Sequence, residues 1–165
     1  MLATIVQLMG EDKAFDYLQQ LNRNIDQYPS ACAGAAPAVG RGETMVGIAF
    51  QHDLIDAAKR ASTVKVVSPC EGTGYEIGSM SIVKGARHPE EAKQFYEWAL
   101  TPEAQALAAA NGSYQVPSNV ATPVPPEAPD PQKLKLIAYD FAKYGSSEER
   151  KRLLTRWTKD VKNAK

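Results

Sequence analysis

The segment most informative about the architecture of this chain is residues 72–96, which read GTGYEIGSMSIVKGARHPEEAKQFY. A glycine-rich loop leads into a short apolar run, residues 77–83, which predicts a buried strand. A turn at Lys84 and Gly85 follows. Pro89 then opens an amphipathic helix, because proline is favoured in the first turn of a helix. A strand followed by a helix in this way is typical of an α/β chain.

The same alternation continues on both sides of this segment. Two further strands are predicted at residues 45–50 and 64–67. Residues 113–131 hold six of the eleven prolines and predict an extended connection laid over a surface, with a flexible linker as the alternative. Helices are predicted at residues 1–9, 11–21, 34–39, 54–60, 89–100, 101–110, 133–143 and 147–161.

Size and composition indicate a globular protein. The chain has 165 residues, of which 44% are apolar and 23% charged. Nineteen basic residues balance nineteen acidic ones, so no charge excess favours nucleic acid or an anionic membrane as a partner. The first ten residues lack the basic region and cleavage site of a signal peptide. A helix starting at Met1 without a cap suggests that the chain was cut from a longer one.

Neither cysteines nor motifs predict a metal site, a cofactor or an enzyme. Cys32 and Cys70 match no zinc pattern, and either two free thiols or one disulfide is compatible with the sequence. No Gly-x-Ser-x-Gly elbow and no Walker loop occurs. The glycines at 72, 74 and 78 precede a predicted strand, whereas those of a dinucleotide fingerprint follow one. We therefore expect no catalytic residues, no metal ligands and no cofactor.

The order of several short motifs resembles the extracytoplasmic solute-binding proteins of ABC importers, in the branch usually described as iron(III) transport components. No single motif is specific, but their order and spacing together are. The motifs are Gly42-Glu43, the apolar run 47–50, His52-Asp53, the loop 69–74, the turn 84–86, Pro102 to Gln105, residues 144–150 and Arg156-Trp157.

This resemblance implies an α/β fold of the type 2 periplasmic-binding-protein kind, with two lobes and a ligand held between them. Members are about twice as long, so it also implies an incomplete fold with most of one lobe missing. Residues 1–72 would be part of the second lobe, and residues 73–165 would return to the first lobe and end in packing helices. Full-length members are periplasmic and deliver solute to an ABC permease.

The resemblance further identifies candidate binding residues. Ferric-binding members use adjacent tyrosines, and this sequence contains no Tyr-Tyr pair. His52 and Asp53, with Glu76 further along, instead resemble the branch that binds phosphorylated sugars. The two carboxylates suit sugar hydroxyls, and His52 donates or accepts. Backbone amides at a helix start suit phosphate, with the Thr73 hydroxyl as a further donor. The amides belong to Gly34, Ala35 and Ala36.

Each candidate has a simpler interpretation. His52 and Asp53 would cap a helix starting at Leu54, Glu76 would be a solvated charge, and residues 34–36 would be an ordinary helix start. Three functions therefore stay open. The first is a solute-binding protein for a small anionic solute, a sugar phosphate; the second is a ferric-iron-binding transport protein. The third is a truncated, non-binding interaction domain, and the surface left by a missing lobe predicts self-association.

Overall fold

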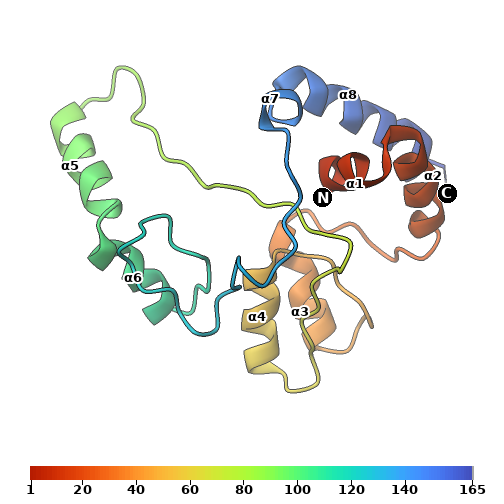
Figure 1. Cartoon of the computed structure of the whole chain (residues 1–165), viewed down its shortest axis with the longest axis horizontal. Coiled ribbons are helices and arrows are strands. Elements are labelled where there is room, and N and C mark those ends of the chain that lie inside the picture. Colours follow the sequence, from red (N-terminus) through yellow and green to blue (C-terminus); the bar gives the residue numbers. More distant parts are fainter. Residues whose placement is uncertain (165) are drawn as a thin grey trace. The chain divides into compact units, whose positions relative to one another are not determined.

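The computed structural model describes residues 1–164, and of Cys32 only the backbone. It forms two compact units, each described here by itself. Unit 1 comprises Met1–Tyr28, Ser68–Glu76 and Pro131–Lys165, and unit 2 comprises Pro29–Val67 and Ile77–Asp130. The helices are α1 (Leu2–Met9), α2 (Glu11–Asn22), α3 (Ala35–Gly40), α4 (Gln51–Arg60), α5 (Pro89–Ala99), α6 (Pro102–Ala110), α7 (Phe141–Tyr144) and α8 (Ser147–Trp157) (Figure 1).

Unit 1 has a true hydrophobic core. Gly10 separates α1 from α2 with a φ of 79°, a conformation that glycine adopts without strain, so the two helices fold back on each other. α2 also packs against a π-helical turn, Thr158–Lys162, that continues α8. The buried side chains at these contacts are Val6, Ala14, Phe15, Leu18, Leu153 and Val161.

A buried polar side chain fastens α2 to the end of the chain. The amide nitrogen of Asn22 donates to the carbonyl of Val161 at 2.7 Å, and its oxygen accepts from the Tyr28 hydroxyl at 2.7 Å. The Tyr28 ring meets the Trp157 ring edge-on, with centroids 5.2 Å apart. Because Asn22 has partners on both sides of its amide, its burial costs little. This arrangement sets the position of α2 against the C-terminal turn.

The helix predicted at residues 133–143 is wrong, except for its last turn, α7. Thr73 donates its backbone N–H to the carbonyl of Lys135 at 2.9 Å, and the N–H of Ile137 donates to the carbonyl of Thr73 at 3.0 Å. These two bonds form an isolated parallel bridge between Thr73 and Leu136. Backbone groups paired sideways with Thr73 cannot also form helical bonds, so residues 135–140 do not join a helix.

In unit 2, α3 and α4 lie side by side (Figure 1). A 3₁₀ turn at Cys32–Gly34 leads into α3. A side chain at Gly47 would come within 2.7 Å of Val39 and 3.2 Å of the Ala35 carbonyl, so glycine allows the segment after α3 to lie against it. The proline-rich segment contacts α4: Lys59 Nζ lies 2.7 Å from Glu127 Oε1 and 4.6 Å from the centre of the Tyr114 ring.

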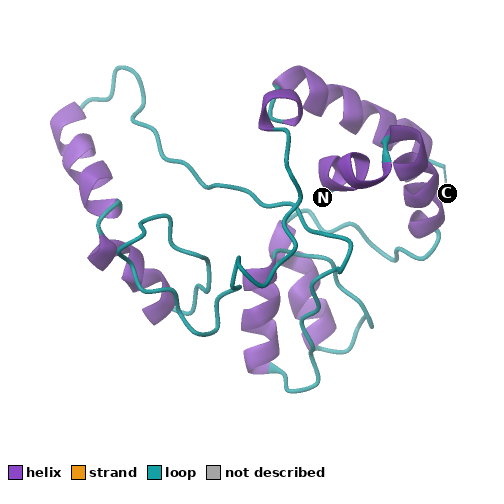
Figure 2. Cartoon of the chain, viewed as in Figure 1, coloured by secondary structure: helices purple, strands orange, loops and turns teal. Residues whose placement is uncertain are grey.

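The predicted strands at residues 45–50, 64–67 and 77–83 are wrong as hydrogen-bonded strands. No strand occurs in residues 1–164, and Figure 2 shows these segments as loops. They all belong to unit 2. A β-strand requires a neighbouring backbone to form its ladder, and in the described part of unit 2 these segments make backbone bonds only in turns at Phe50, Val64 and Val83.

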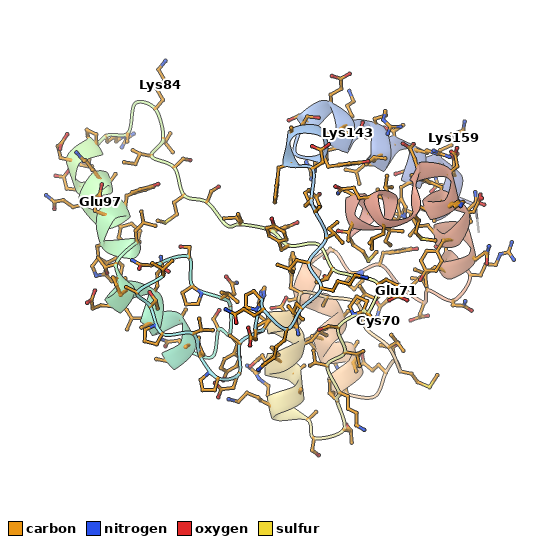
Figure 3. All side chains as sticks on the ribbon, viewed as in Figure 1. Cys70, Glu71, Lys84, Glu97, Lys143 and Lys159 are labelled. Carbon is orange, nitrogen blue, oxygen red and sulfur yellow. The ribbon has the colours of Figure 1, made fainter. Side chains whose placement is uncertain are left out.

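The size of the buried side chains distinguishes unit 2 from unit 1. The buried side chains of unit 2 among the described residues are small: Ala36, Ala38, Thr122 and Ala128. No residue of α5 is buried, although its Phe95 and Trp98 rings lie together with centroids 5.5 Å apart. Figure 3 shows the polar groups of this region, with Glu97 on α5 and Lys84 at the loop tip before it.

The predicted division into residues 1–72 and 73–165 refers to the lobes of a longer protein and stays a prediction.

Of the helices in residues 1–164, none combines the length and the apolar character that crossing a lipid bilayer requires.

Candidate functional site

His52 and Asp53 lie in the first turn of α4. This helix begins at Gln51, three residues earlier than predicted, and its N-cap is Phe50, whose side chain makes no capping bond. Asp53 is thus the third residue of the helix, and the simpler interpretation of His52 and Asp53 as caps for a helix starting at Leu54 is wrong. Asp53 is instead the acidic residue of the first turn of α4, where the positive end of the helix dipole lies.

The two side chains form a partly open polar group. His52 Nε2 lies 3.6 Å from Asp53 Oδ1 and 3.3 Å from the side-chain nitrogen of Gln115. The imidazole ring stacks almost parallel on Phe50, at an interplanar angle of 11° and a centroid distance of 5.5 Å. Side-chain exposure is 26% for His52 and 25% for Asp53, so both present polar atoms to solvent. The group offers donors and acceptors suited to hydroxyls.

Asp53 also lines a groove between α3 and α4. The groove has a volume of about 320 Å³ and is lined on the α3 side by Ala36 and on the α4 side by Asp53 and Ala57, among others. Two arginines at its rim are already paired: Arg41 with Glu43 at 2.6 Å and Arg60 with Asp56 at 3.0 Å. This volume is at the lower end of the range for small-molecule sites.

The backbone amides at the start of α3 are partly used within the chain. Gly34 donates to the carbonyl of Ala31 at 3.0 Å, and Ala35 donates to that of Ala33. The reason is the 3₁₀ turn, which runs directly into α3 and supplies acceptors to its first amides. Sequence reasoning did not anticipate this turn. Of the three predicted phosphate donors, Ala36 is the one that lines the groove.

The other two predicted residues, Thr73 and Glu76, belong to unit 1. Both backbone groups of Thr73 are engaged in the bridge to residues 135–137, and its hydroxyl donates to the Gly74 carbonyl at 3.1 Å. Glu76 is exposed and lies near Tyr139. The pKa of Tyr139 is raised, chiefly by burial and further by the negative charge of Glu76.

Aromatic side chains surround this part of unit 1. Phe141 meets Tyr75 edge-on at a centroid distance of 5.4 Å and Tyr139 at 4.8 Å. Tyr75 therefore packs against another ring of its own unit. Tyr139 beside Glu76 and Gln115 beside His52 were both missed by sequence reasoning. Gln115 lies 63 residues from His52 in the proline-rich segment, and no local pattern marks either of them.

Among the metal-ligand side chains, Cys70 is described, whereas the side chain of Cys32 lies outside the described part of the structure. In the portion of the chain that is described, no three side chains of the His, Cys, Asp or Glu types gather closely enough to hold a metal ion. Cys70 is a free, exposed thiol whose sulfur lies 3.4 Å from Glu71 Oε2, and Figure 3 labels these neighbouring side chains.

Comparisons with known proteins agree on one family. The family model described as "Bacterial extracellular solute-binding protein" matches residues 3–135. An uncharacterized protein of Haemophilus influenzae is 47% identical over 165 residues, which cover 99% of this chain and 48% of that protein.

Two solved structures are similar along nearly the whole chain. One is the periplasmic binding protein AfuA from Actinobacillus pleuropneumoniae with exogenous fructose-6-phosphate bound, with a TM-score of 0.93 and 48% identity over 99% of this chain and 51% of that one. The other is the periplasmic binding protein P5PA, with a TM-score of 0.84 and 36% identity over 97% of this chain and 51% of that one. The chain thus spans about half the length of the relatives it matches.

Proposed function

The chain belongs to the bacterial extracellular solute-binding proteins, and on this premise we propose that it takes part in binding a small phosphorylated organic solute, a sugar phosphate. Its periplasmic-binding-protein fold, of which it spans about half, is confirmed by the two similar structures. The family consists of solute-binding proteins, and we propose that this chain likewise binds solute without transforming it.

The observation that carries the proposal is the likeness to AfuA. The two chains are 48% identical along 99% of this one, and the AfuA structure holds fructose-6-phosphate. Identity at this level supports a similar solute class, although ligand specificity resides in a few side chains. Binding of a sugar phosphate by this chain therefore requires side chains that form hydrogen bonds with sugar hydroxyls and with phosphate.

The polar group on α4 supplies part of that chemistry. Asp53 accepts hydrogen bonds from sugar hydroxyls, while His52 donates or accepts according to its tautomer. Gln115 adds an amide within 3.3 Å of His52. Hydrogen bonds to a charged carboxylate contribute about 1.5–3 kcal/mol each when water is excluded. The ring of Phe50 stacks on His52, a contact that supports a fixed position for the imidazole in a binding role.

Glu76, Thr73 and the α3 amides are the other predicted binding groups. We propose that Glu76 accepts from hydroxyls, because its carboxylate is exposed. We propose Thr73 and the α3 amides as phosphate donors, with Ala36 the best placed of the three because Gly34 and Ala35 already donate within the chain. The wider role that this proposal implies is periplasmic capture of the anionic solute and its transfer to an ABC permease.

Binding by the chain itself is tested with fructose 6-phosphate followed by amide NMR. We expect weak, millimolar binding, because tight pockets cover most of a ligand's surface and this chain spans about half of its relatives. Shifts should be largest at residues 51–54, and fructose or inorganic phosphate alone should produce smaller ones. Unshifted amides at residues 51–54 with all three probes would contradict the role of the α4 group.

A chimera gives the quantitative test. These 165 residues replace the matching part of AfuA, and calorimetry measures fructose 6-phosphate binding. We expect Asp53→Asn to weaken binding by about 10- to 100-fold, the equivalent of one charge-assisted hydrogen bond. Asp26→Asn, which neutralises an exposed carboxylate of unit 1, serves as the matched control. A chimera that melts cooperatively but binds no sugar phosphate would refute the proposal.

A further inference from the structure

The loop that carries Glu76 is in close contact with two other parts of unit 1. At Gly72, an added Cβ would come within 3.6 Å of Leu8 on α1 and 3.0 Å of Ile137. The residue after it makes both backbone bonds of the parallel bridge to residues 135–137. The loop therefore contacts α1 and the bridged segment at once, shortly before it reaches Glu76.

Gly74 makes the closest of these approaches. A Cβ at this position would overlap the hydroxyl oxygen of Thr4 and lie 3.4 Å from the Thr4 Cβ and Cγ2 atoms. Thr4 lies one helical turn before Leu8 on the same face of α1. Because threonine is β-branched and its χ1 angle is restricted in a helix, the side chain has little freedom to move aside. A side chain at residue 74 would therefore push the loop away from α1.

The requirement for glycine at residue 74 is one of space alone. Gly74 is not among the glycines with a positive φ, so its backbone conformation is open to alanine. Gly78 provides the contrast, because it also lacks a positive φ and a Cβ there would meet nothing within 4 Å. The two glycines lie two residues before and two residues after Glu76. Their substitution therefore separates the contact with Thr4 from the loss of a glycine as such.

The residues that follow Gly74 connect this contact to the Glu76 carboxylate. Tyr75 packs edge-on against Phe141 at a centroid distance of 5.4 Å, and Phe141 packs against Tyr139 at 4.8 Å. The negative charge of Glu76 acts on the same Tyr139, whose pKa is raised chiefly by burial and further by this charge. Glu76, although exposed, thus has a defined neighbour within unit 1.

We propose that Thr4 and Gly74 are positioning residues of the solute site, whose close contact sets the place of the Glu76 carboxylate. This inference rests on the proposed function, in which Glu76 accepts from a sugar hydroxyl. A hydroxyl must come within about 3 Å of the carboxylate oxygen for a strong bond. A displaced loop therefore weakens binding even though the carboxylate itself is unchanged, and neither Thr4 nor Gly74 has to touch the solute.

The test uses the chimera with AfuA and calorimetry with fructose 6-phosphate. We expect Gly74→Ala to weaken binding by about tenfold, the equivalent of one charge-assisted hydrogen bond. Gly78→Ala and Thr4→Ala alone should each weaken it by less than about twofold. Thr4→Ala removes the hydroxyl and methyl groups that a Cβ at residue 74 would meet. The double variant Thr4→Ala/Gly74→Ala should therefore bind within about threefold of the wild type.

Glu76→Gln shows whether the contact acts through Glu76. In a Glu76→Gln background, Gly74→Ala should weaken binding by less than about twofold further, because the group that it displaces is already impaired. A merely structural role of Gly74 would give the same loss of about tenfold in both backgrounds. Binding by Gly74→Ala equal to that by Gly78→Ala, or a double variant as weak as Gly74→Ala, would overturn the proposal and leave the solute standing.

The place of Glu76 also has a readout in the 165-residue chain without solute. Carbon-13 NMR of labelled tyrosine rings follows the pKa of Tyr139, which should fall in Glu76→Gln and in Gly74→Ala because both take negative charge away from the phenol. Thr4→Ala/Gly74→Ala should restore it. A chimera that binds no fructose 6-phosphate would refute the solute, and this pKa would then decide the positioning contact. A value lowered by Gly74→Ala and restored in the double variant sustains the contact, whereas an unchanged value overturns it.

Discussion

Arg152 donates two hydrogen bonds to the carboxylate of Glu11, at 2.8 and 2.6 Å, and thereby joins α8 to the first turn of α2. Arg156, one helical turn later, donates to the same carboxylate at 2.7 Å. Glu149 pairs with Arg152 from the other side at 2.8 Å. The result is a charge network on the outside of the unit 1 core, and it makes unit 1 sensitive to acid.

The first prediction concerns pH. Hydrogen bonding from Arg152, and further from Arg156, lowers the pKa of Glu11 from 4.5 to about 2. Because the folded-state pKa lies below the unfolded value, ionised Glu11 stabilises the fold above about pH 4.5, and this contribution is lost as the pH falls from 4.5 towards 2. Urea unfolding monitored between pH 7 and pH 2.5 measures the loss.

Glu11→Gln should lower the free energy of unfolding at pH 7 by about 1 kcal/mol, as expected for an exposed but networked pair. The variant should also flatten the acid dependence. Asp16→Asn, which removes an exposed carboxylate from the same helix, is the control and should do neither. Equal pH profiles for the wild type and Glu11→Gln would disprove the role of this network.

The second prediction concerns the unit 1 core. Phe15 is buried, and the guanidinium of Arg156 lies over its ring at 4.2 Å. Phe15→Ala should lower the free energy of unfolding by about 3–5 kcal/mol through lost burial and a residual cavity. Tyr17→Ala on the exposed side of α2 should change it by no more than about 0.5 kcal/mol. Chemical denaturation followed by Trp157 fluorescence measures both.

The third prediction concerns a buried hydroxyl in unit 2. Thr122 Oγ1 is buried and has no hydrogen-bond partner among the described residues. Thr122→Val replaces it with a methyl group of similar size and should be neutral or stabilise by up to about 1 kcal/mol. Thr122→Ser keeps the hydroxyl, loses the methyl group and should destabilise by about 0.8 kcal/mol. A marked loss of stability in Thr122→Val would show that the hydroxyl has a partner in solution.

The fourth prediction concerns the proline-rich segment. The side chains of Glu127, first, and Tyr114 raise the pKa of Lys59 to about 12. The raised pKa means that this link is present below about pH 10.5, the ordinary value, and disappears as the pH rises to 12. Lys59→Met should accelerate hydrogen exchange at residues 113–116 several-fold at neutral pH. Lys93→Met on α5 should leave that exchange unchanged, and an effect of equal size in both variants would argue against the link.

Helix termini could be predicted because their signals are local. Thr101 caps α6 by accepting from the Ala104 amide at 3.2 Å, as its position before Pro102 predicts. Ser146 likewise accepts from the Glu149 amide at 3.2 Å. Ser146 and Glu149 have the spacing of a capping box, but its reciprocal half is absent among the described residues, because the Glu149 carboxylate bonds to Arg152 instead. Arg152 lies three residues after Glu149 on the same helix, so it competes locally for that carboxylate.

Burial was harder to predict than helix termini. Helical spacing in residues 147–161 predicts one buried stripe of Leu153, Leu154 and Trp157, but Leu154 is exposed in a groove beside Arg150 and Lys151. Leu153 alone of the two leucines enters the core, because α8 meets α2 and the C-terminal turn on one narrow side. Helical spacing identifies a face, whereas the neighbouring elements determine how much of that face is covered.

For the candidate site, the resemblance of the sequence to a family singled out His52, Asp53 and Glu76, whose binding roles stay predictions, and composition marked three segments as strands. Only the tertiary structure revealed Gln115 beside His52, the 3₁₀ turn that occupies the Gly34 and Ala35 amides, and the absence of ladder partners for those segments in residues 1–164. Caps, prolines and glycines act within a few residues, so sequence determines them. Pairing and side-chain proximity depend on groups many residues apart, and only the folded chain brings those together.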